Sequence, residues 1–253
     1  RHLLDVETGI EGEPRVHYYT LGEESWKAAD TWPPPGTETR TLFLAPGDVL
    51  APEPPKETDG ADAYEIDFKA GTGDRARWNC LIFVLGPVGY FDRAERDRRL
   101  LTYTSAPLDR DWEVTGHPIV TLHVSADAPD AAVFAYLEDV DPRGRVHYVT
   151  EGMLRALHRR ESNPPSGSAL PIPHRTFARG DAAPLVPGEP AELRFDLLPI
   201  SYRFFRGHRI RVALAGADAD HFAPVPDGAR VLTIHRSAAL PSSIELPVMP
   251  APR

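Results

Sequence analysis

The sequence contains little sulfur and no long apolar segment. Its 253 residues include two methionines and a single cysteine, Cys80, which excludes an internal disulfide, so nothing requires an oxidising compartment. No apolar run is long enough to cross a membrane, and the N-terminus lacks the hydrophobic region of a signal peptide. These absences favour a cytoplasmic over a secreted location, but they do not fix it, because the chain begins at Arg1 without an initiator methionine.

The sequence also lacks a basic region. Its formal net charge is −9, from 28 Lys and Arg against 37 Asp and Glu residues. Proteins that bind nucleic acid or anionic membranes concentrate Lys and Arg in a stripe or patch. The composition therefore argues against nucleic acid and against a membrane as partners.

A third absence concerns catalysis. The chain has no Gly-x-Ser-x-Gly, the sharp strand-to-helix turn that exposes a nucleophilic serine. Its only serines beside a glycine lie in Pro165-Ser166-Gly167-Ser168, which no strand pattern precedes and no helical pattern follows. We therefore assign no catalytic residue.

Proline is abundant and separates short alternating segments. The chain has 27 prolines, about twice the usual share of roughly 5%, and proline ends both helices and strands. In residues 210–214 and 193–197 every second side chain is apolar, which indicates half-buried antiparallel strands. We expect Arg209 and Arg211 to face water.

Further segments show strand patterns. A type I turn at Asp141-Pro142-Arg143-Gly144 is expected to join two of them. Helix is predicted only at residues 93–99 and 202–205, and long loops at 45–60 and 161–190. The other expected strands are residues 16–19, 41–44, 100–103, 120–124, 133–138, 146–158, 231–235 and 244–248. The sequence therefore predicts an all-β fold, a jelly-roll β-sandwich of the galactose-binding-like type with two antiparallel sheets.

Five segments together resemble a known family. Trp26-Lys27-Ala28-Ala29-Asp30-Thr31-Trp32-Pro33-Pro34 is similar to the segment after the hydrolase domain in X-Pro dipeptidyl-peptidase and cocaine-esterase-like (CocE/NonD) serine hydrolases. The remaining segments resemble the C-terminal domain of that family, in the same order. They are Leu101-Thr102-Tyr103-Thr104-Ser105-Ala106-Pro107-Leu108 with Val114-Thr115-Gly116, Gly152-Met153-Leu154-Arg155-Ala156, Gly207-His208-Arg209-Ile210-Arg211, and Pro241-Ser242-Ser243-Ile244-Glu245-Leu246-Pro247.

The resemblance implies a division of labour. Members of the family cleave esters, amides or Xaa-Pro peptides with a Ser-Asp-His triad in an α/β-hydrolase domain, which would lie before Arg1. This chain would be one non-catalytic C-terminal domain, with residues 1–35 following the hydrolase domain and 36–253 forming the jelly-roll body. Its partner would be that hydrolase domain, and through it a small substrate, with no cofactor or metal. A docking face left uncovered would favour self-association into homo-oligomers.

One stretch is assigned to the substrate pocket. In the family, a loop of the β domain supplies apolar side chains to the acyl pocket. Residues 76–90 show no clear alternation and precede the first strongly family-like strand. By position we choose Trp78, Asn79, Leu81 and Tyr90 as pocket or interface residues; the alternative is ordinary packing of a large indole.

Several polar clusters leave other interpretations open. Asp218, Asp220 and His221 could form a metal corner, although local turn bonds account for aspartates after a strand equally well. The clusters 127–130 and 138–141 have calcium-like spacing, but we interpret them as turn formers at strand ends. His208 is expected to donate to a backbone carbonyl. A second class of function, an independent carbohydrate- or ligand-binding jelly-roll, also remains open.

Overall fold

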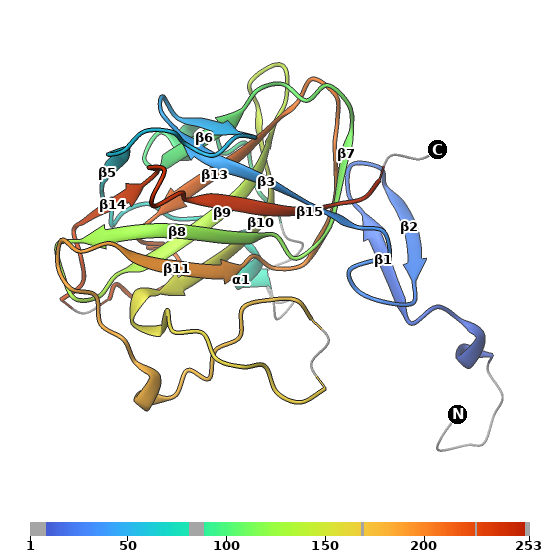
Figure 1. Ribbon diagram of the computed structural model, residues 1–253. Helices are drawn as coiled ribbons and strands as arrows, with labels where there is room; N and C mark the ends of the chain where they lie inside the picture. Colours follow the sequence, from blue (N-terminus) through green and yellow to red (C-terminus); the bar gives the residue numbers. More distant parts are fainter. Residues whose placement is uncertain (1–8, 81–88, 168–169, 226, 251–253) are drawn as a thin grey trace.

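The computed structural model describes residues 9–80, 89–167, 170–225 and 227–250 (Figure 1). The protein is nearly all β, with 41% of its residues in strands and 7% in helices. Its strands are β1 (Val16–Thr20), β2 (Ser25–Ala29), β3 (Glu38–Ala45), β4 (Val49–Ala51), β5 (Ala61–Glu65), β6 (Leu101–Ser105), β7 (Trp112–Gly116), β8 (Ile119–Ala126), β9 (Ala132–Val140), β10 (Val146–Arg155), β11 (Ala191–Asp196), β12 (Ile200–Phe204), β13 (Arg209–Ala215), β14 (Val231–His235) and β15 (Ser243–Val248).

Helices are few and short in the described part of the chain. The α-helices are α1 (Arg77–Cys80) and α2 (Ala94–Asp97), and single 3-10 turns lie at Ile10–Gly12, Ala156–His158 and Arg179–Asp181. Neither α-helix approaches the length and apolar character that a bilayer-spanning helix needs.

Two sheets form the sandwich. The strand order is β10-β9-β13-β6-β4-β3-β15-β8-β14-β5. We call β10, β9, β13 and β6 the first sheet, and β3, β15, β8, β14 and β5, with β11 beside β8, the second sheet. The short β4 joins them, since it pairs antiparallel with β3 and parallel with β6. A two-stranded hairpin, β1 and β2, extends to one side (Figure 1).

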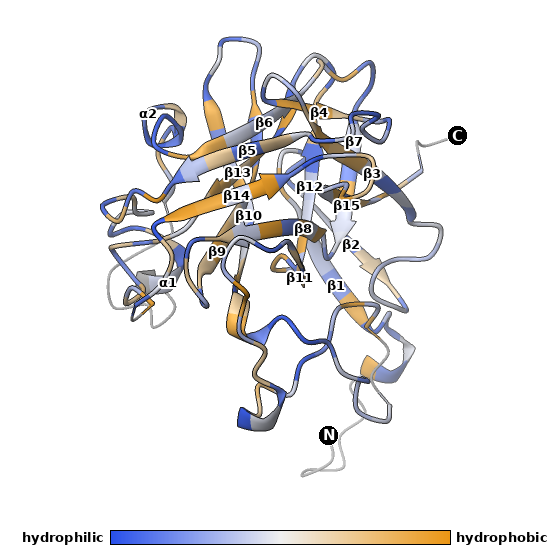
Figure 2. Cartoon of the chain, turned by 60° about the vertical axis from the view of Figure 1, so that its left-hand side comes forward, coloured by the Kyte–Doolittle hydropathy of each residue, from blue (hydrophilic) through white to orange (hydrophobic). Residues whose placement is uncertain are grey.

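The main core lies between these sheets. Alternate residues of β9, β13, β8 and β15 meet there in a single apolar cluster. In Figure 2 much of the apolar colouring lies on the strands, while the loops are of mixed hydropathy. The largest enclosed side chains include Tyr103, Phe204, Leu122, Leu137, Ile210 and Ile244. The period-two patterns read from the sequence therefore correspond to real sandwich strands.

The first sheet is buried on its second face as well. Phe134 and Tyr136 of β9 and Ala213 and Ala215 of β13 form a separate apolar cluster, against which Phe222 packs. The described residues 67–80 and 89–100 contribute to the cover of this face, since Tyr90 stacks on Tyr148, Arg93 lies over Tyr136 and Leu100 packs on the cluster; we call these residues the covering segment. Because of this cover, Arg211 does not face water as expected: its side chain is 20% exposed and pairs with Asp97.

The strand predictions were largely right and the second helix was wrong. Each of the ten expected strands is present, and the Asp141–Gly144 turn joins β9 to β10 as predicted. Residues 202–205, however, belong to β12 up to Phe204, which pairs antiparallel with β7. The expected loop 45–60 contains β4, and β2, β5 and β7 were not predicted.

Candidate functional site

The indole of Trp78 packs on the outer face of the first sheet. It is half-buried in α1, and its ring meets Phe222 edge-on, with centroids 5.3 Å apart and an interplanar angle of 81°. Phe222 in turn packs on Phe134 of β9 at 5.2 Å. Trp78 is thus not enclosed between the two sheets, which was the arrangement that would have made it a simple core residue.

Tyr90, the second predicted pocket residue, is anchored to β10. Its ring stacks on Tyr148 with centroids 3.6 Å apart, and its hydroxyl donates to Oε1 of Glu151 at 3.1 Å. The backbone N–H of Arg77 donates to the same hydroxyl at 2.9 Å. Tyr90 and the start of α1 are therefore joined directly.

The other predicted pocket residues are less informative. Asn79 belongs to α1, and Leu81 lies outside the described residues. The structure thus brings Trp78 and Tyr90 to one side of the first sheet, where both belong to the covering segment. Their place in a substrate pocket stays a prediction.

Several buried polar atoms near this cover have no hydrogen-bond partner in the described chain, and two of them lie in or beside the predicted pocket residues. These two are Nε1 of Trp78 and Oε2 of Glu151, and Glu151 itself is 1% exposed. Burial raises the pKa of Glu151, against the hydrogen bonds that stabilise its charge. Such unsatisfied buried groups are costly, so they mark this side of the sheet as a place where further contacts would be favourable.

A buried ion-pair network fixes the covering segment beside them. Arg93 donates from Nε to Glu138 of β9, and Arg211 of β13 donates to Oδ2 of Asp97 at 2.8 Å. Burial raises the pKa of Glu138, and the neighbouring Asp97 adds to this while Arg93 opposes it. Sequence analysis missed this network because its members are far apart in the chain.

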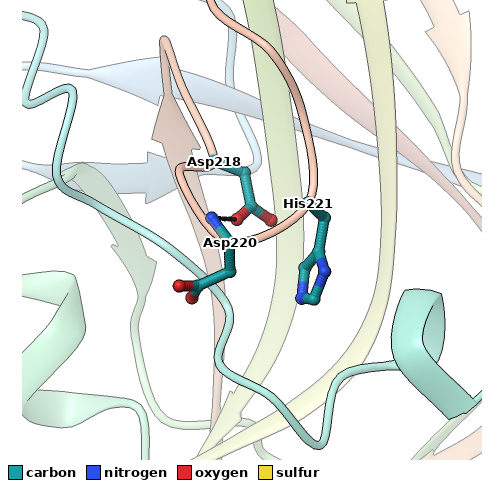
Figure 3. Close-up of side chains that lie close together, drawn as sticks. All are labelled: Asp218, Asp220 and His221. Carbon is teal, nitrogen blue, oxygen red and sulfur yellow. Dashed lines mark hydrogen bonds between the residues drawn. The ribbon is translucent and has the colours of Figure 1, made fainter.

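The candidate metal corner holds a loop in place. Asp218 accepts from the Asp220 N–H at 3.1 Å, as Figure 3 shows, and its Oδ2 accepts from the Thr72 hydroxyl at 2.7 Å. Asp220 accepts from the Gly73 N–H at 2.6 Å, and Nε2 of His221 donates to the Gly73 carbonyl at 2.9 Å. The three ligand atoms lie within 4.8 Å of one another. We assign these residues the structural role of holding the 72–73 loop, because each of them bonds a protein partner there or in its own turn.

The two calcium-like clusters differ in outcome. Asp127 accepts from two backbone N–H groups at the start of β14, and Asp141 accepts from two in its own turn, as turn-forming aspartates do. Glu138 and Asp139, by contrast, lie inside β9 and are buried. The interpretation of these two as turn formers was wrong.

His208 has a structural partner of a different kind from the one expected. Its Nδ1 lies 2.9 Å from Oδ1 of Asp139, so the partner is a buried carboxylate and not a backbone carbonyl. The Tyr202 hydroxyl donates to the same carboxylate at 2.9 Å. Position 208 therefore connects the loop before β13 with β9.

A serine and a histidine do meet elsewhere. Oγ of Ser125 in β8 lies 2.9 Å from Nε2 of His235 in β14, and burial lowers the pKa of that histidine. Among the residues the structure describes, no carboxylate bonds its other ring nitrogen. The pair therefore lacks the orienting group that a catalytic triad requires.

Fold and site together define an all-β sandwich domain without a complete triad in its described part. The sequence matches, over residues 8–244, the family described as the X-Pro dipeptidyl-peptidase C-terminal non-catalytic domain. The chain belongs to this family. The resemblance inferred from five short segments is thereby confirmed.

Individual proteins similar to the chain are longer hydrolases by name. A protein of Mycobacterium bovis named "Putative serine esterase" is 54% identical over 98% of this chain and 39% of its own length. The cocaine esterase of a Rhodococcus species is 27% identical over 98% of the chain and 44% of its own length. The chain thus spans about two fifths of the length of these relatives.

Solved structures share the fold. An α-amino acid ester hydrolase superposes with a TM-score of 0.73 at 20% identity, over 93% of this chain and 41% of that one. An aminopeptidase from a marine sediment archaeon superposes with a TM-score of 0.71 at 24% identity, over 94% of this chain and 41% of that one. At these identities the likeness establishes the sandwich and says nothing of substrate.

Proposed function

We propose that this chain is the accessory β domain of a serine hydrolase and that the protein carrying it hydrolyses esters. The observation that carries the proposal is the family match across residues 8–244. The one hydrogen bond between a serine and a histidine side chain among the described residues, Ser125–His235, has no orienting acid. Catalysis would then reside in an α/β-hydrolase domain on which this chain packs.

Esters are the favoured substrate class among esters, amides and Xaa-Pro peptides. The two similar proteins reported above carry esterase names. One of them is 54% identical to this chain over 98% of the chain. The alternative of an independent carbohydrate-binding module is not favoured by any of these comparisons.

The covering segment is the part of the domain that we place beside the substrate. Trp78 presents a half-buried ring outside the main core, and Tyr90 is held rigidly on Tyr148 and Glu151. A pocket wall needs apolar side chains whose positions are fixed by a rigid support. The doubly buried first sheet supplies that support to this segment.

Ester turnover tests the division of labour. The 253-residue chain and the hydrolase-length protein carrying it are assayed with p-nitrophenyl butyrate, with and without a fluorophosphonate. We expect inhibitor-sensitive turnover from the longer protein and none from the chain, because a nucleophile, base and orienter must act together. Fluorophosphonate-sensitive turnover by the chain alone would refute the proposal.

A further inference from the structure

A small cationic pocket lies between the covering segment and the first sheet. Its volume is about 170 Å³, and it is bounded by the backbone of residues 69–71, by α2 and by the end of β13. Four cations line it, with a single carboxylate and an aromatic ring: Lys69, Arg93, Arg96, Arg99, Asp220 and Tyr136. In a protein with a net charge of −9, this concentration of positive charge is unusual.

Two of the four cations form no ion pair with a carboxylate among the described residues, although Lys69 interacts electrostatically with Asp67 at longer range. Nη1 of Arg96 donates to the Gly71 carbonyl at 3.1 Å, a neutral acceptor. The Lys69 ammonium has no hydrogen-bond acceptor among the described residues. Arg99 is different, because it is paired with Asp67. The positive charge of the pocket is therefore only partly compensated.

Arg93 adds an unused donor in the interior. The residue is 2% exposed, and its guanidinium lies over the Tyr136 ring at 4.3 Å. Its Nε is used by Glu138, but the buried Nη1 has no partner in the described part of the chain. A guanidinium presents its donors in a planar fork that matches an oxyanion.

The loop opposite α2 is built to let Arg96 approach the backbone. Gly73 has a φ of +88°, and a Cβ at this position would come within 2.6 Å of Nη2 of Arg96. A side chain at Gly73 would thus displace the guanidinium. The absence of a side chain at Gly73 leaves room for the guanidinium of Arg96 in this position.

Asp220 allows the pocket to distinguish an oxyanion that carries a proton from one that is fully deprotonated. One of its oxygens accepts from the Gly73 N–H, and the other has no partner among the described residues. A free carboxylate oxygen repels a fully deprotonated oxyanion, but it accepts a hydrogen bond from an oxyanion that still carries a proton. At neutral pH, monohydrogen phosphate has such a proton and sulfate has none.

We propose that this pocket binds a small protonated oxyanion, of which monohydrogen phosphate is the type. Lys69, Arg96 and Arg93 donate hydrogen bonds to its oxygens, and the Asp220 carboxylate accepts a hydrogen bond from its protonated oxygen. A volume of about 170 Å³ is that of a small pocket and suits a single small anion. This site is separate from ester hydrolysis and does not depend on it.

Calorimetric titration of the protein with potassium phosphate at pH 7.5, in a phosphate-free buffer of constant ionic strength, tests the proposal. We expect saturable binding with a Kd on the order of 1 mM or tighter, and binding of sulfate about tenfold or more weaker. Lys69→Ala and Arg96→Gln should each weaken phosphate binding about tenfold, the loss of one charge-assisted contact. Lys69 is exposed, so its variant is not expected to compromise folding.

Two further variants make the result decisive. Asp220→Asn should bring sulfate and phosphate to similar affinities, because an amide can donate to either anion. Arg98→Ala, next to α2 but 74% exposed and outside the pocket, should leave binding unchanged. Absence of saturable heat would overturn the proposal. Equal losses in Arg98→Ala and Lys69→Ala would also overturn it, by showing general charge attraction.

Discussion

The guanidinium of Arg93 lies over the ring of Tyr136, 4.3 Å from its centroid, on the face of the first sheet that is turned away from the main core. This contact and the ion pair of Arg93 with Glu138 connect the covering segment to β9. The segment proposed to border the substrate is thus held by buried charge as well as by apolar packing. Four predictions test this arrangement.

Removal of Arg93 should destabilise the protein strongly. Arg93→Met leaves Glu138 without its cationic partner in a site that is fully enclosed. Leaving a buried carboxyl without its hydrogen-bond donor costs about 1–3 kcal/mol, which urea unfolding followed by fluorescence measures directly. The exposed Arg98→Ala is the control, expected within about 0.5 kcal/mol of the parent. Similar losses in the two variants would show that the buried network contributes little.

Neutralisation of Glu138 should change how stability depends on pH. Because burial raises its pKa, the native state keeps a proton that the unfolded chain releases above a pKa of about 4.3. The unfolded state binds fewer protons in this range, so Glu138 makes stability fall as pH rises from 5 toward the raised value. The glutamine of Glu138→Gln cannot lose a proton. The free energy of unfolding of this variant should therefore fall below that of the parent by a margin that shrinks between pH 5 and pH 8.

Urea unfolding of both proteins at pH 5, 6, 7 and 8 measures that margin. Glu95→Gln, a neutralisation at a side chain 77% exposed in α2, controls for net charge. A margin for Glu138→Gln that stays constant or grows with pH would show that the carboxyl is ionised in the folded protein.

Loss of the Tyr90 hydroxyl should loosen the start of α1. Tyr90→Phe keeps the stack on Tyr148 but removes the acceptor of the Arg77 N–H and the donor to Glu151. Unsatisfied buried polar groups cost about 1–3 kcal/mol, and amide exchange of residue 77 should accelerate. Tyr64→Phe, which removes a hydroxyl bond to the Arg99 carbonyl, is the matched control. Unchanged exchange at residue 77 in Tyr90→Phe would contradict this account.

The sandwich was predictable because many of its strands carry a local hydrophobic pattern with a period of two. Residues 193–197 alternate strictly between apolar and charged side chains, and the period of two specifies a sheet face without knowledge of the partner strand. The sequence also indicates that the first sheet is buried on both faces. Residues 131–137 are an uninterrupted apolar run, which is typical of strands covered on both sides. The expectation that Arg211 faces water considered only the pattern of its own strand. Arg211 lies opposite Glu138 of β9 and shares the covered face of that strand.

Contacts between distant segments could not be predicted. Trp78 meets Phe222, and Arg93 meets Glu138, across 144 and 45 positions. No local pattern encodes such pairs, since they depend on how the covering segment crosses the sheet. Likewise, Tyr202 and its neighbours form β12 only because β7 pairs with them, and tertiary pairing overrides the weak local preference for a helical turn.

Steady-state kinetics of Trp78→Ala in the hydrolase-length protein test the central claim most directly. A p-nitrophenyl ester series of increasing acyl length separates uniform binding from chemistry through KM and kcat. We predict that Trp78→Ala raises KM in a way that depends on acyl length and leaves fluorophosphonate labelling intact. Trp26→Ala, at an indole 73% exposed on the β1–β2 hairpin, should have no such effect. Unchanged kinetics with reduced stability would contradict the claim that the covering segment borders the substrate.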